Sequence, residues 1–405
     1  MKQATSGAQA GTPAAPNELT GAAAWRLIAI TVVIGCLVMM ALYSAIVLIP
    51  AIAAEFGVGA NGAAWAVTAF ALVYAGALPL FGALSDRRGR KQVFLPGLVA
   101  LALATLLVAL SPSFPALIAL RAAEGVAAAT YVPVVLAYLR ETVPRRLAPT
   151  AIAVFSFGLL VAGVLGQVYG AAVASRLGWR WVYFLLAAAY LAAALVSSFL
   201  PGAPPPSRRG GALIRPMIAL SSRGDLRGAY AAALVVLLAF TAMYTGLQRI
   251  HGQGGVAVEV DILTLRLIDM PGMLTCLIAG VLAERFWPGR VAVAGLFVAA
   301  LGLAVEGTAT GSGVLILGSL IFVAGISLTF PSLLELIART AGEARGVALA
   351  LAGFALFSGA SLGPVLASAL IGRGFGELCL VLGVVLVAGA AGLMLGSLRT
   401  AERKR

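Results

Sequence analysis

The sequence consists mainly of long apolar runs, of which Leu27–Pro50, Val93–Leu110 and Val291–Val305 are examples. A run of about 20 apolar residues is long enough to cross a bilayer as an α-helix. The runs do not alternate between apolar and polar residues, so they are not strands of a membrane barrel. Only 11% of the 405 residues are charged, against about 25% in soluble domains. We therefore predict an all-α membrane protein.

Charges, prolines and glycine clusters divide the chain into twelve predicted spans. They cover residues 27–50, 63–84, 93–110, 116–139, 150–174, 181–200, 228–247, 262–282, 291–307, 313–334, 346–371 and 378–398. Residues 1–24 lack periodicity and are predicted to be a disordered tail that is not a cleavable signal peptide. The predicted linker 201–227, which is rich in Pro, Gly and Arg, separates two six-helix bundles, 25–200 and 228–398. Residues 399–405 form a second predicted tail.

The distribution of basic residues predicts the topology of the chain. If both termini lie in the cytoplasm, most of the 28 lysines and arginines fall in cytoplasmic segments, as the positive-inside rule requires. We therefore expect a multi-pass protein of the cell inner (plasma) membrane with both termini cytoplasmic. This asymmetry accounts for the net charge of +13. Nucleic acid is not an expected partner, because the basic residues do not gather on one face.

Few residues of this sequence are of the types that bind metals or cofactors. The chain has one histidine, His251, and three cysteines, Cys36, Cys276 and Cys379, each alone in its own segment. Such single residues do not form a metal cluster or a disulfide framework. No pairing of a nucleophile with a base is evident. We therefore predict no metal, no cofactor and no enzymatic activity.

The two halves of the chain contain similar motifs about 200 residues apart. Gly82, Asp86, Arg87, Gly89 and Arg90 recur as Gly280, Glu284, Arg285, Gly289 and Arg290, and Gly166–Gln167 recurs as Gly363–Pro364. This agreement predicts an internal duplication. Parallel repeats of six helices with a site between them are an alternating-access design.

The turn after the second span reads Gly82-Ala-Leu-Ser-Asp86-Arg87-Arg88-Gly89-Arg90-Lys91. It resembles the signature G-x-x-x-D-R-x-G-R-K of the major facilitator superfamily, both in composition and in its place between spans two and three. Arg121-Ala-Ala-Glu124-Gly125 and Gly178-Trp179-Arg180-Trp181 are similar to motifs of the drug/proton antiporter branch, whereas Gln167 stands where that branch has proline. The resemblance implies twelve transmembrane helices in two pseudo-symmetric six-helix bundles.

We predict that this turn acts as a conformational latch. Gly82 allows two helices to approach closely, and the Asp86 carboxylate can accept hydrogen bonds from a helix N-terminus or pair with an arginine. The resemblance implies that Asp86 lies near the start of span eleven, and Arg140 is its expected partner. The predicted latch residues are Gly82, Asp86, Arg87, Gly89, Arg90, Lys91 and Arg140. The alternative is a basic anchor that only fixes topology.

Two pairs of charged residues lie inside predicted spans, namely Arg121 with Glu124 and Arg266 with Asp269. A charge inside a membrane is costly and suggests function. In each pair the spacing of three places both residues on one helix face, and Pro271 is expected to loosen the second helix. We predict that these pairs couple protons to transport or contact substrate. Snorkelling arginines and neutralised structural ion pairs are the alternatives.

Several polar residues are predicted to line a central cavity: Tyr43, Tyr131, Gln167, Thr241, Tyr244 and Gln248. The resemblance implies that spans one, four, seven and ten form the pathway. Alternatively, single hydroxyl groups in membrane helices bond to backbone carbonyls.

These features predict a secondary active transporter that works by alternating access, most simply a proton-coupled exporter of amphipathic small molecules. One alternative is a specific proton-linked carrier, or importer, of a metabolite such as an organic anion or a sugar. Another is a membrane sensor. The expected partners are a small-molecule substrate, protons and the lipid bilayer, and the protein is expected to be a monomer.

Overall fold

The computed structural model describes residues 21–202, 214–252 and 262–402. Within these ranges the secondary structure is helical and contains no strand. The first helices are α1 (Gly21–Phe56), α2 (Ala60–Ala63), α3 (Trp65–Arg88), α4 (Lys91–Ala109), α5 (Phe114–Ala128), α6 (Val132–Thr142), α7 (Ala148–Leu177) and α8 (Trp179–Ser198). They are followed by α9 (Ile214–Ser222), α10 (Gly224–Gly252), α11 (Ile262–Ile268), α12 (Met270–Met273), α13 (Thr275–Phe286), α14 (Pro288–Gly307), α15 (Ser312–Ala341), α16 (Arg345–Leu370) and α17 (Phe375–Glu402). Short 3-10 turns cover Arg145–Leu147, Gly342–Ala344 and Ile371–Arg373.

Eleven helical segments in the described part of the chain are long and apolar enough to cross a membrane. The twelfth predicted span, 262–282, falls on α11, α12 and α13, three short helices that follow one another with breaks at Asp269 and Leu274. Pro271 lies in α12. Proline has no backbone N–H to donate and its ring clashes with the preceding turn, which accounts for the interruption that the sequence predicts here.

The fourth span is also interrupted. Ser113 caps the start of α5, accepting a hydrogen bond from the Ala116 amide at 3.4 Å. The helix ends at Ala128, and α6 begins after three intervening residues, with Pro133 in its first turn. Proline is well tolerated at the start of a helix, where its missing N–H has no intrahelical partner. The break therefore separates a half of the span that carries Arg121 from a half that carries Arg140.

The two predicted tails and the predicted linker differ from the structure. Helix α1 begins at Gly21, inside the predicted tail, and α17 continues to Glu402, inside the second predicted tail. The predicted linker contains α9, whose Leu220 is buried where the helix packs on α10 and α16. Apolar residues in the linker thus find a surface on which a short helix can pack. Residues 1–20, 203–213 and 403–405 lie outside the described residues.

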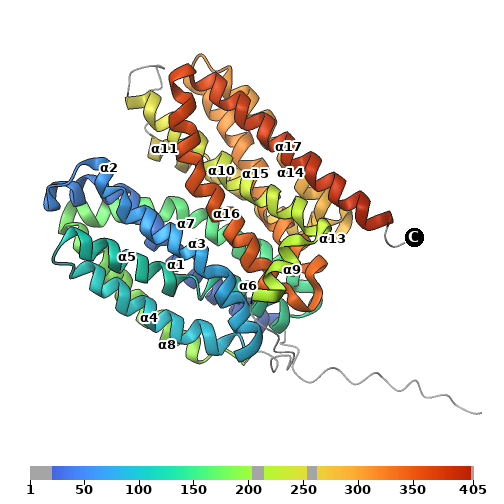
Figure 1. Cartoon of the computed structure of the whole chain (residues 1–405), viewed down its shortest axis with the longest axis horizontal. Coiled ribbons are helices and arrows are strands. Elements are labelled where there is room, and N and C mark those ends of the chain that lie inside the picture. Colours follow the sequence, from blue (N-terminus) through green and yellow to red (C-terminus); the bar gives the residue numbers. More distant parts are fainter. Residues whose placement is uncertain (1–20, 203–213, 253–261, 403–405) are drawn as a thin grey trace, which may run out of the picture.

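The helices form two bundles, α1 to α8 and α10 to α17, shown from blue to green and from yellow to red in Figure 1. Contacts between them come mainly from α3 against α16, α7 against α13 and α15, and α6 against α16. The bundles meet at the end where α6, α9 and α13 lie, and they diverge toward the end where α2 and α11 lie (Figure 1). The interface between the bundles is therefore concentrated at one end.

Close packing of α10 on α16 gives a prediction about stability. A Cβ atom added at Gly359 of α16 would collide with the backbone carbonyl of Leu234 in α10. Gly359→Ala should therefore force the helices apart, at a cost of about 1–3 kcal/mol, and lower the melting temperature in detergent. Gly76→Ala is the matched control, because a Cβ at this exposed position meets no atom within 4 Å. An equal melting temperature for both variants would contradict the helix contact.

Candidate functional site

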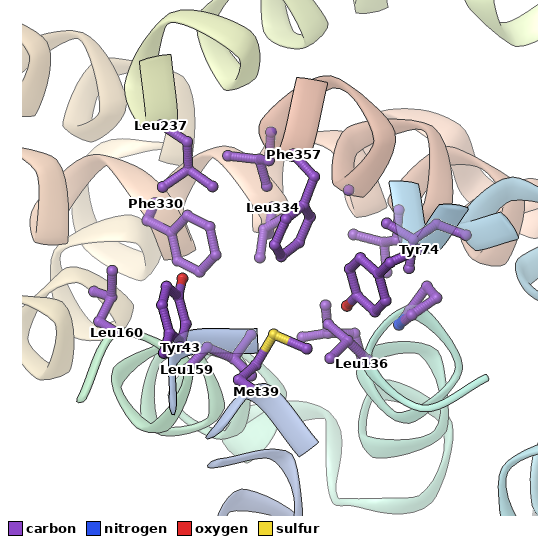
Figure 2. Close-up of a pocket in the computed structure, with 16 residues that line it drawn as sticks. Met39, Tyr43, Tyr74, Leu136, Leu159, Leu160, Leu237, Phe330, Leu334 and Phe357 are labelled. Carbon is purple, nitrogen blue, oxygen red and sulfur yellow. The ribbon is translucent and has the colours of Figure 1, made fainter. Parts of the chain in front are cut away.

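A cavity lies between the two bundles and is lined from both sides. Its volume is about 580 Å³ when the open space at its mouth is counted. The first bundle contributes Met39, Leu136, Leu159 and Leu160, among others, and the second contributes Leu237, Phe330, Leu334 and Phe357 (Figure 2). The lining is apolar except for the hydroxyl groups of Tyr43 and Tyr74. A site of this kind binds chiefly through apolar contact and shape.

The two phenols lie on opposite sides of this cavity in Figure 2. Tyr74 is fully buried, and its ring meets the Phe357 ring edge-on with centroids 4.6 Å apart. Its hydroxyl has no hydrogen-bond partner in the described part of the chain. Tyr43 lies within electrostatic range of Arg266. The phenols are thus the polar groups available to a molecule in the cavity, and Tyr43 connects the cavity to the buried charges of the second bundle.

Other residues predicted to line the cavity lie elsewhere. The Tyr131 hydroxyl donates to the Thr31 carbonyl at 3.3 Å, and Gln167 Nε2 donates to the Gly163 carbonyl at 2.7 Å. Thr241 Oγ1 donates to backbone carbonyls of α10 and α16. In hydrocarbon a polar side chain is stabilised by any acceptor within reach, so spacing along a helix is a weak guide to its direction. The side chain of Gln248 lies outside the described residues.

Arg121 and Glu124 form a completely buried pair inside the first bundle. Arg121 Nη1 lies 2.5 Å from Glu124 Oε2, and its other nitrogens donate to the carbonyls of Ala66 and Ala41 at 2.9 and 3.2 Å. Glu124 Oε1 accepts a hydrogen bond from Thr105 at 2.7 Å. Helices α1, α3, α4 and α5 therefore satisfy both charges away from the cavity. This geometry favours a fixed structural pair, and the coupling role stays a prediction.

Arg266 and Asp269 are arranged differently, with Tyr244 between them. Asp269 is buried at the break before α12, and its Oδ2 accepts hydrogen bonds from Tyr244 at 2.6 Å and from Ser319 at 2.7 Å. The Arg266 guanidinium lies 4.6 Å from the centre of the same Tyr244 ring. Asp269 Oδ1 and Arg266 Nε have no hydrogen-bond partner among the described residues. The pair therefore keeps unused hydrogen-bonding capacity, unlike Arg121 and Glu124.

Glu306, in the last turn of α14, was not among the predicted site residues. It is 1% exposed, and neither carboxyl oxygen has a hydrogen-bond partner in the described part of the chain. It lies within electrostatic range of Asp269. The signal was present in the sequence, since Glu306 is an acidic residue at the end of an apolar run. Across the described ranges, no group of three or more His, Cys, Asp and Glu side chains is arranged to hold a metal ion.

At the end where the bundles meet, Arg90 connects several charges. It is 5% exposed, forms an ion pair with Asp86, and donates to Ser85 Oγ at 2.6 Å and to Glu141 Oε1 at 2.8 Å. Burial disfavours the charged guanidinium, but the hydrogen bond to Glu141 and the charge of Asp86 outweigh it and raise the pKa of Arg90. Glu141 also pairs with Arg345 of α16 at 3.3 Å. This network therefore spans both bundles.

The expected pairing of Asp86 with Arg140 is wrong in this structure. Arg140 of α6 pairs with Glu335 of α15 at 2.5 Å, and Glu335 also pairs with Arg339 at 2.6 Å. Asp86 already has Arg90, four residues along its own chain, so Arg140 is free to reach the opposite bundle. We call this part of the molecule the ion-pair end, defined by Asp86, Arg90, Arg140, Glu141, Glu335 and Arg345.

The start of α16 lies against the predicted latch, as the resemblance implied for span eleven. A Cβ atom at Gly82 would collide with Ala350 and with the Gly346 carbonyl, and one at Gly346 would collide with the Asp86 carboxylate. The absence of side chains at both glycines therefore allows α3 and α16 to touch. Arg345, at the start of α16, pairs with Glu141 of α6, so an ion pair between the bundles accompanies this close helix contact, as the predicted latch requires.

The remaining residues of the turn hold its shape. Gly89 has φ +98°, in the region that favours glycine, and its N–H closes α3 on the Ser85 carbonyl at 3.0 Å. Lys91 Nζ donates to the carbonyls of Ser198 and Leu200 at 2.7 and 2.5 Å. Arg87 is exposed. Lys91 thus fastens the turn to the end of α8 within the first bundle rather than to the second bundle.

A family model described as the Major Facilitator Superfamily matches residues 31–364 of the chain. This chain belongs to the major facilitator superfamily. Proteins of this superfamily are transporters, so the cavity between the bundles is the candidate substrate site of a multi-span membrane transporter. The all-α fold and the family predicted from the sequence are confirmed.

Similar proteins include several transporters. Over 139 residues the chain is 30% identical to the multidrug export protein EmrB of Escherichia coli, a match that covers 34% of this chain and 27% of EmrB. The chain matches about a third or less of the length of EmrB and similar curated relatives. Among solved structures, the E. coli fucose:proton symporter FucP has a TM-score of 0.75 at 14% identity, covering 92% of this chain and 99% of FucP. The human organic anion transporter MFSD10 has a TM-score of 0.73 at 18% identity, with coverage of 91% and 99%.

The ion-pair end gives a prediction about conformation. Arg140→Gln removes the contact with Glu335 and leaves this buried carboxylate with Arg339 alone. The variant should therefore open the ion-pair end more often. Spin-label distance measurements between α6 and α15 should show a larger population at long distance. Arg373→Gln is the control, since it breaks an exposed pair with Glu377 at the other end. Unchanged distances in Arg140→Gln would contradict a latch at this contact.

Glu124 gives a prediction about stability. Glu124→Gln leaves the Arg121 charge buried without its counterion, which costs about 3–5 kcal/mol. Asp269→Asn should cost less, because Asp269 has neutral hydrogen-bond donors and no direct ion pair within the described residues. Thermal unfolding in detergent compares the two variants. A stable Glu124→Gln protein that has lost proton coupling would instead support the coupling role of this pair.

Proposed function

We propose that this transporter is a proton-driven exporter of amphipathic small molecules. The observation that carries the proposal is the cavity between the bundles, which is apolar apart from the Tyr43 and Tyr74 hydroxyls. Such a lining suits a flat or flexible apolar molecule with few hydrogen-bonding groups. A sugar requires many directional hydrogen bonds, which this cavity does not offer. Aromatic and flexible apolar side chains also favour recognition of several different substrates.

Proton coupling is assigned to Asp269, with Arg266 and Tyr244. As a carboxylate, Asp269 accepts the Tyr244 hydrogen bond and attracts the guanidinium that lies over the Tyr244 ring. When Asp269 takes up a proton, its attraction for Arg266 ends, and Arg266 is released toward Tyr43 and the cavity. Proton uptake thereby changes the charge beside the substrate site. Each proton supplies about 2.3 kcal/mol per 100 mV and about 1.4 kcal/mol per pH unit.

In the proposed cycle the halves 25–200 and 228–398 rock about the cavity. Residues of the ion-pair end hold them together in the conformation described here. The positive-inside rule assigns this end, and both termini, to the cytoplasm. The cavity would then be reached from the outer side in this conformation, and breaking the ion pairs would open it to the cytoplasm. The similarity to EmrB, a multidrug export protein, supports export as the direction.

A specific observation favours a second candidate function, the transport of an organic anion. Arg266 Nε has no hydrogen-bond partner among the described residues, and Arg266 lies in electrostatic range of the cavity residue Tyr43. An arginine with unused donors is a suitable partner for a carboxylate or phosphate group. Arg121 is unsuited to this role, because each of its nitrogens already has a partner. MFSD10, which has a similar fold, is described as an organic anion transporter.

The proposed function predicts proton-linked dye transport. Purified protein in liposomes with an imposed pH gradient should move a cationic dye such as ethidium against its gradient. Asp269→Asn should accumulate less dye for a given pH gradient and keep movement down the dye gradient, because the substituted side chain no longer exchanges a proton. The control is Asp225→Asn, which changes a partly exposed ion pair with Arg223.

The same assay separates the candidate functions. Dye movement that persists after a protonophore collapses the pH gradient would reject proton coupling. Loss of carboxylate transport in Arg266→Gln, with no dye transport by the wild-type protein, would favour the organic-anion carrier. Equal pH-driven transport by wild-type and Asp269→Asn proteins would reject the site and leave the family unaffected.

A further inference from the structure

Among the buried acidic residues that the structure describes, Glu306 has the fewest compensating contacts. It is 1% exposed, and both of its carboxyl oxygens lack hydrogen-bond partners within the described ranges. Glu124, by comparison, has an arginine and a threonine, and Asp269 has a tyrosine and a serine. An ionised carboxylate without partners in an apolar interior is so costly that the group holds a proton instead. The surroundings in this conformation therefore favour a neutral carboxylic acid at Glu306 over a carboxylate.

The groups around Glu306 do little to stabilise a negative charge on it. Glu306 lies in the last turn of α14, where the helix dipole is negative. Asp269 acts on it from the break before α12, and Cys379 of α17 and Tyr244 of α10 lie in its electrostatic range. Gly318 of α15 packs closely against Glu306, since a Cβ atom added at this glycine would collide with it. None of these titratable neighbours is a cation.

Helix α15 brings Glu306 and Asp269 to the same region. An added Cβ at Gly318 would lie 2.8 Å from the Glu306 Cβ, and the next residue, Ser319, donates a hydrogen bond to Asp269 at 2.7 Å. Consecutive residues of one helix therefore touch both acidic residues. The two residues reach α15 from different elements, α14 and the break between α11 and α12. A movement of the loosened α11–α13 segment relative to α14 changes the separation of the two carboxyl groups.

We propose that Glu306 is a second proton-binding site of the transport cycle, distinct from Asp269. Glu306 takes a proton from water when its carboxyl group is exposed to the outer side, carries it as a neutral acid while buried as in this structure, and returns it to water when it is exposed to the cytoplasm. No bond other than the carboxyl O–H forms or breaks. The proposal rests on proton-driven transport, and it implies one more proton per cycle than Asp269 alone provides.

The test is the dependence of dye accumulation on the pH gradient. Wild-type and Glu306→Gln proteins are placed in liposomes whose membrane potential is clamped at zero, and equilibrium ethidium accumulation is measured at several pH gradients. Each coupled proton contributes about tenfold per pH unit. Glu306→Gln should therefore reduce accumulation by about tenfold per pH unit of gradient. Glu377→Gln, at an exposed position paired with Arg373, should match the wild-type protein. Equal slopes for Glu306→Gln and wild type would overturn the proposal.

A second measurement tests the protonation of Glu306 without a transport assay. Infrared difference spectra between neutral and alkaline pH should show loss of a protonated-carboxyl band in the wild type and in Glu377→Gln, and this band should be absent in Glu306→Gln. An identical band in Glu306→Gln would overturn the proposal. If Glu306→Gln does not fold, Glu306→Leu replaces it, because the site offers no hydrogen-bond partner that leucine would leave unsatisfied. Wild-type protein without proton-linked transport would reject the proposed function, while the spectra would still test Glu306.

Discussion

A charge inside a bilayer must be compensated by the protein, because hydrocarbon offers it neither water nor counterions. The buried charged and acidic groups of this chain differ in how far they are compensated. Arg121 and Glu124 neutralise one another and use the backbone carbonyls of neighbouring helices. Asp269 relies on neutral hydroxyl donors, with an arginine held at a distance by an aromatic ring. Glu306 has neither. In the proposed cycle, the degree of compensation separates the pair that fixes structure from the carboxyl groups that exchange protons.

Much of the fold followed from the sequence, because hydrocarbon imposes simple rules on length and charge. Apolar runs predicted the helices, and the turn from Gly82 to Lys91 identified the family. The interruption at Pro271 was expected, because the effect of proline on a helix is local. The helix α9 was missed, since nine residues of mixed composition become helical only when a neighbouring bundle supplies an apolar surface. Contact with neighbouring helices, rather than the local sequence pattern, therefore determined that this segment is helical.

The site was less predictable, because its pairs join residues that are distant in sequence. Arg140 meets Glu335 across 195 positions, and Arg345 meets Glu141 across 204. Each of these charges looks, in sequence, like an ordinary residue near the end of a span. Tyr244 followed the helical spacing of a cavity residue but turned toward a carboxylate. Glu306 was overlooked although its position in an apolar run carried the same signal as Asp269. The direction in which such a side chain points, and the partner that it meets, depend on the packing of several helices.

The broken eighth span has a consequence for the order of events during turnover. Its piece α13 is tied to the opposite bundle, where Cys276 contacts the Ala153 carbonyl at 3.3 Å and Gly280 lies against Pro149. Its piece α11 carries Arg266, on the other side of the interruption. A continuous helix would transmit any tilt of one piece directly to the other. In the proposed cycle, the break between these pieces lets Arg266 respond to proton uptake by Asp269 before the two halves separate, because the two pieces need not move together.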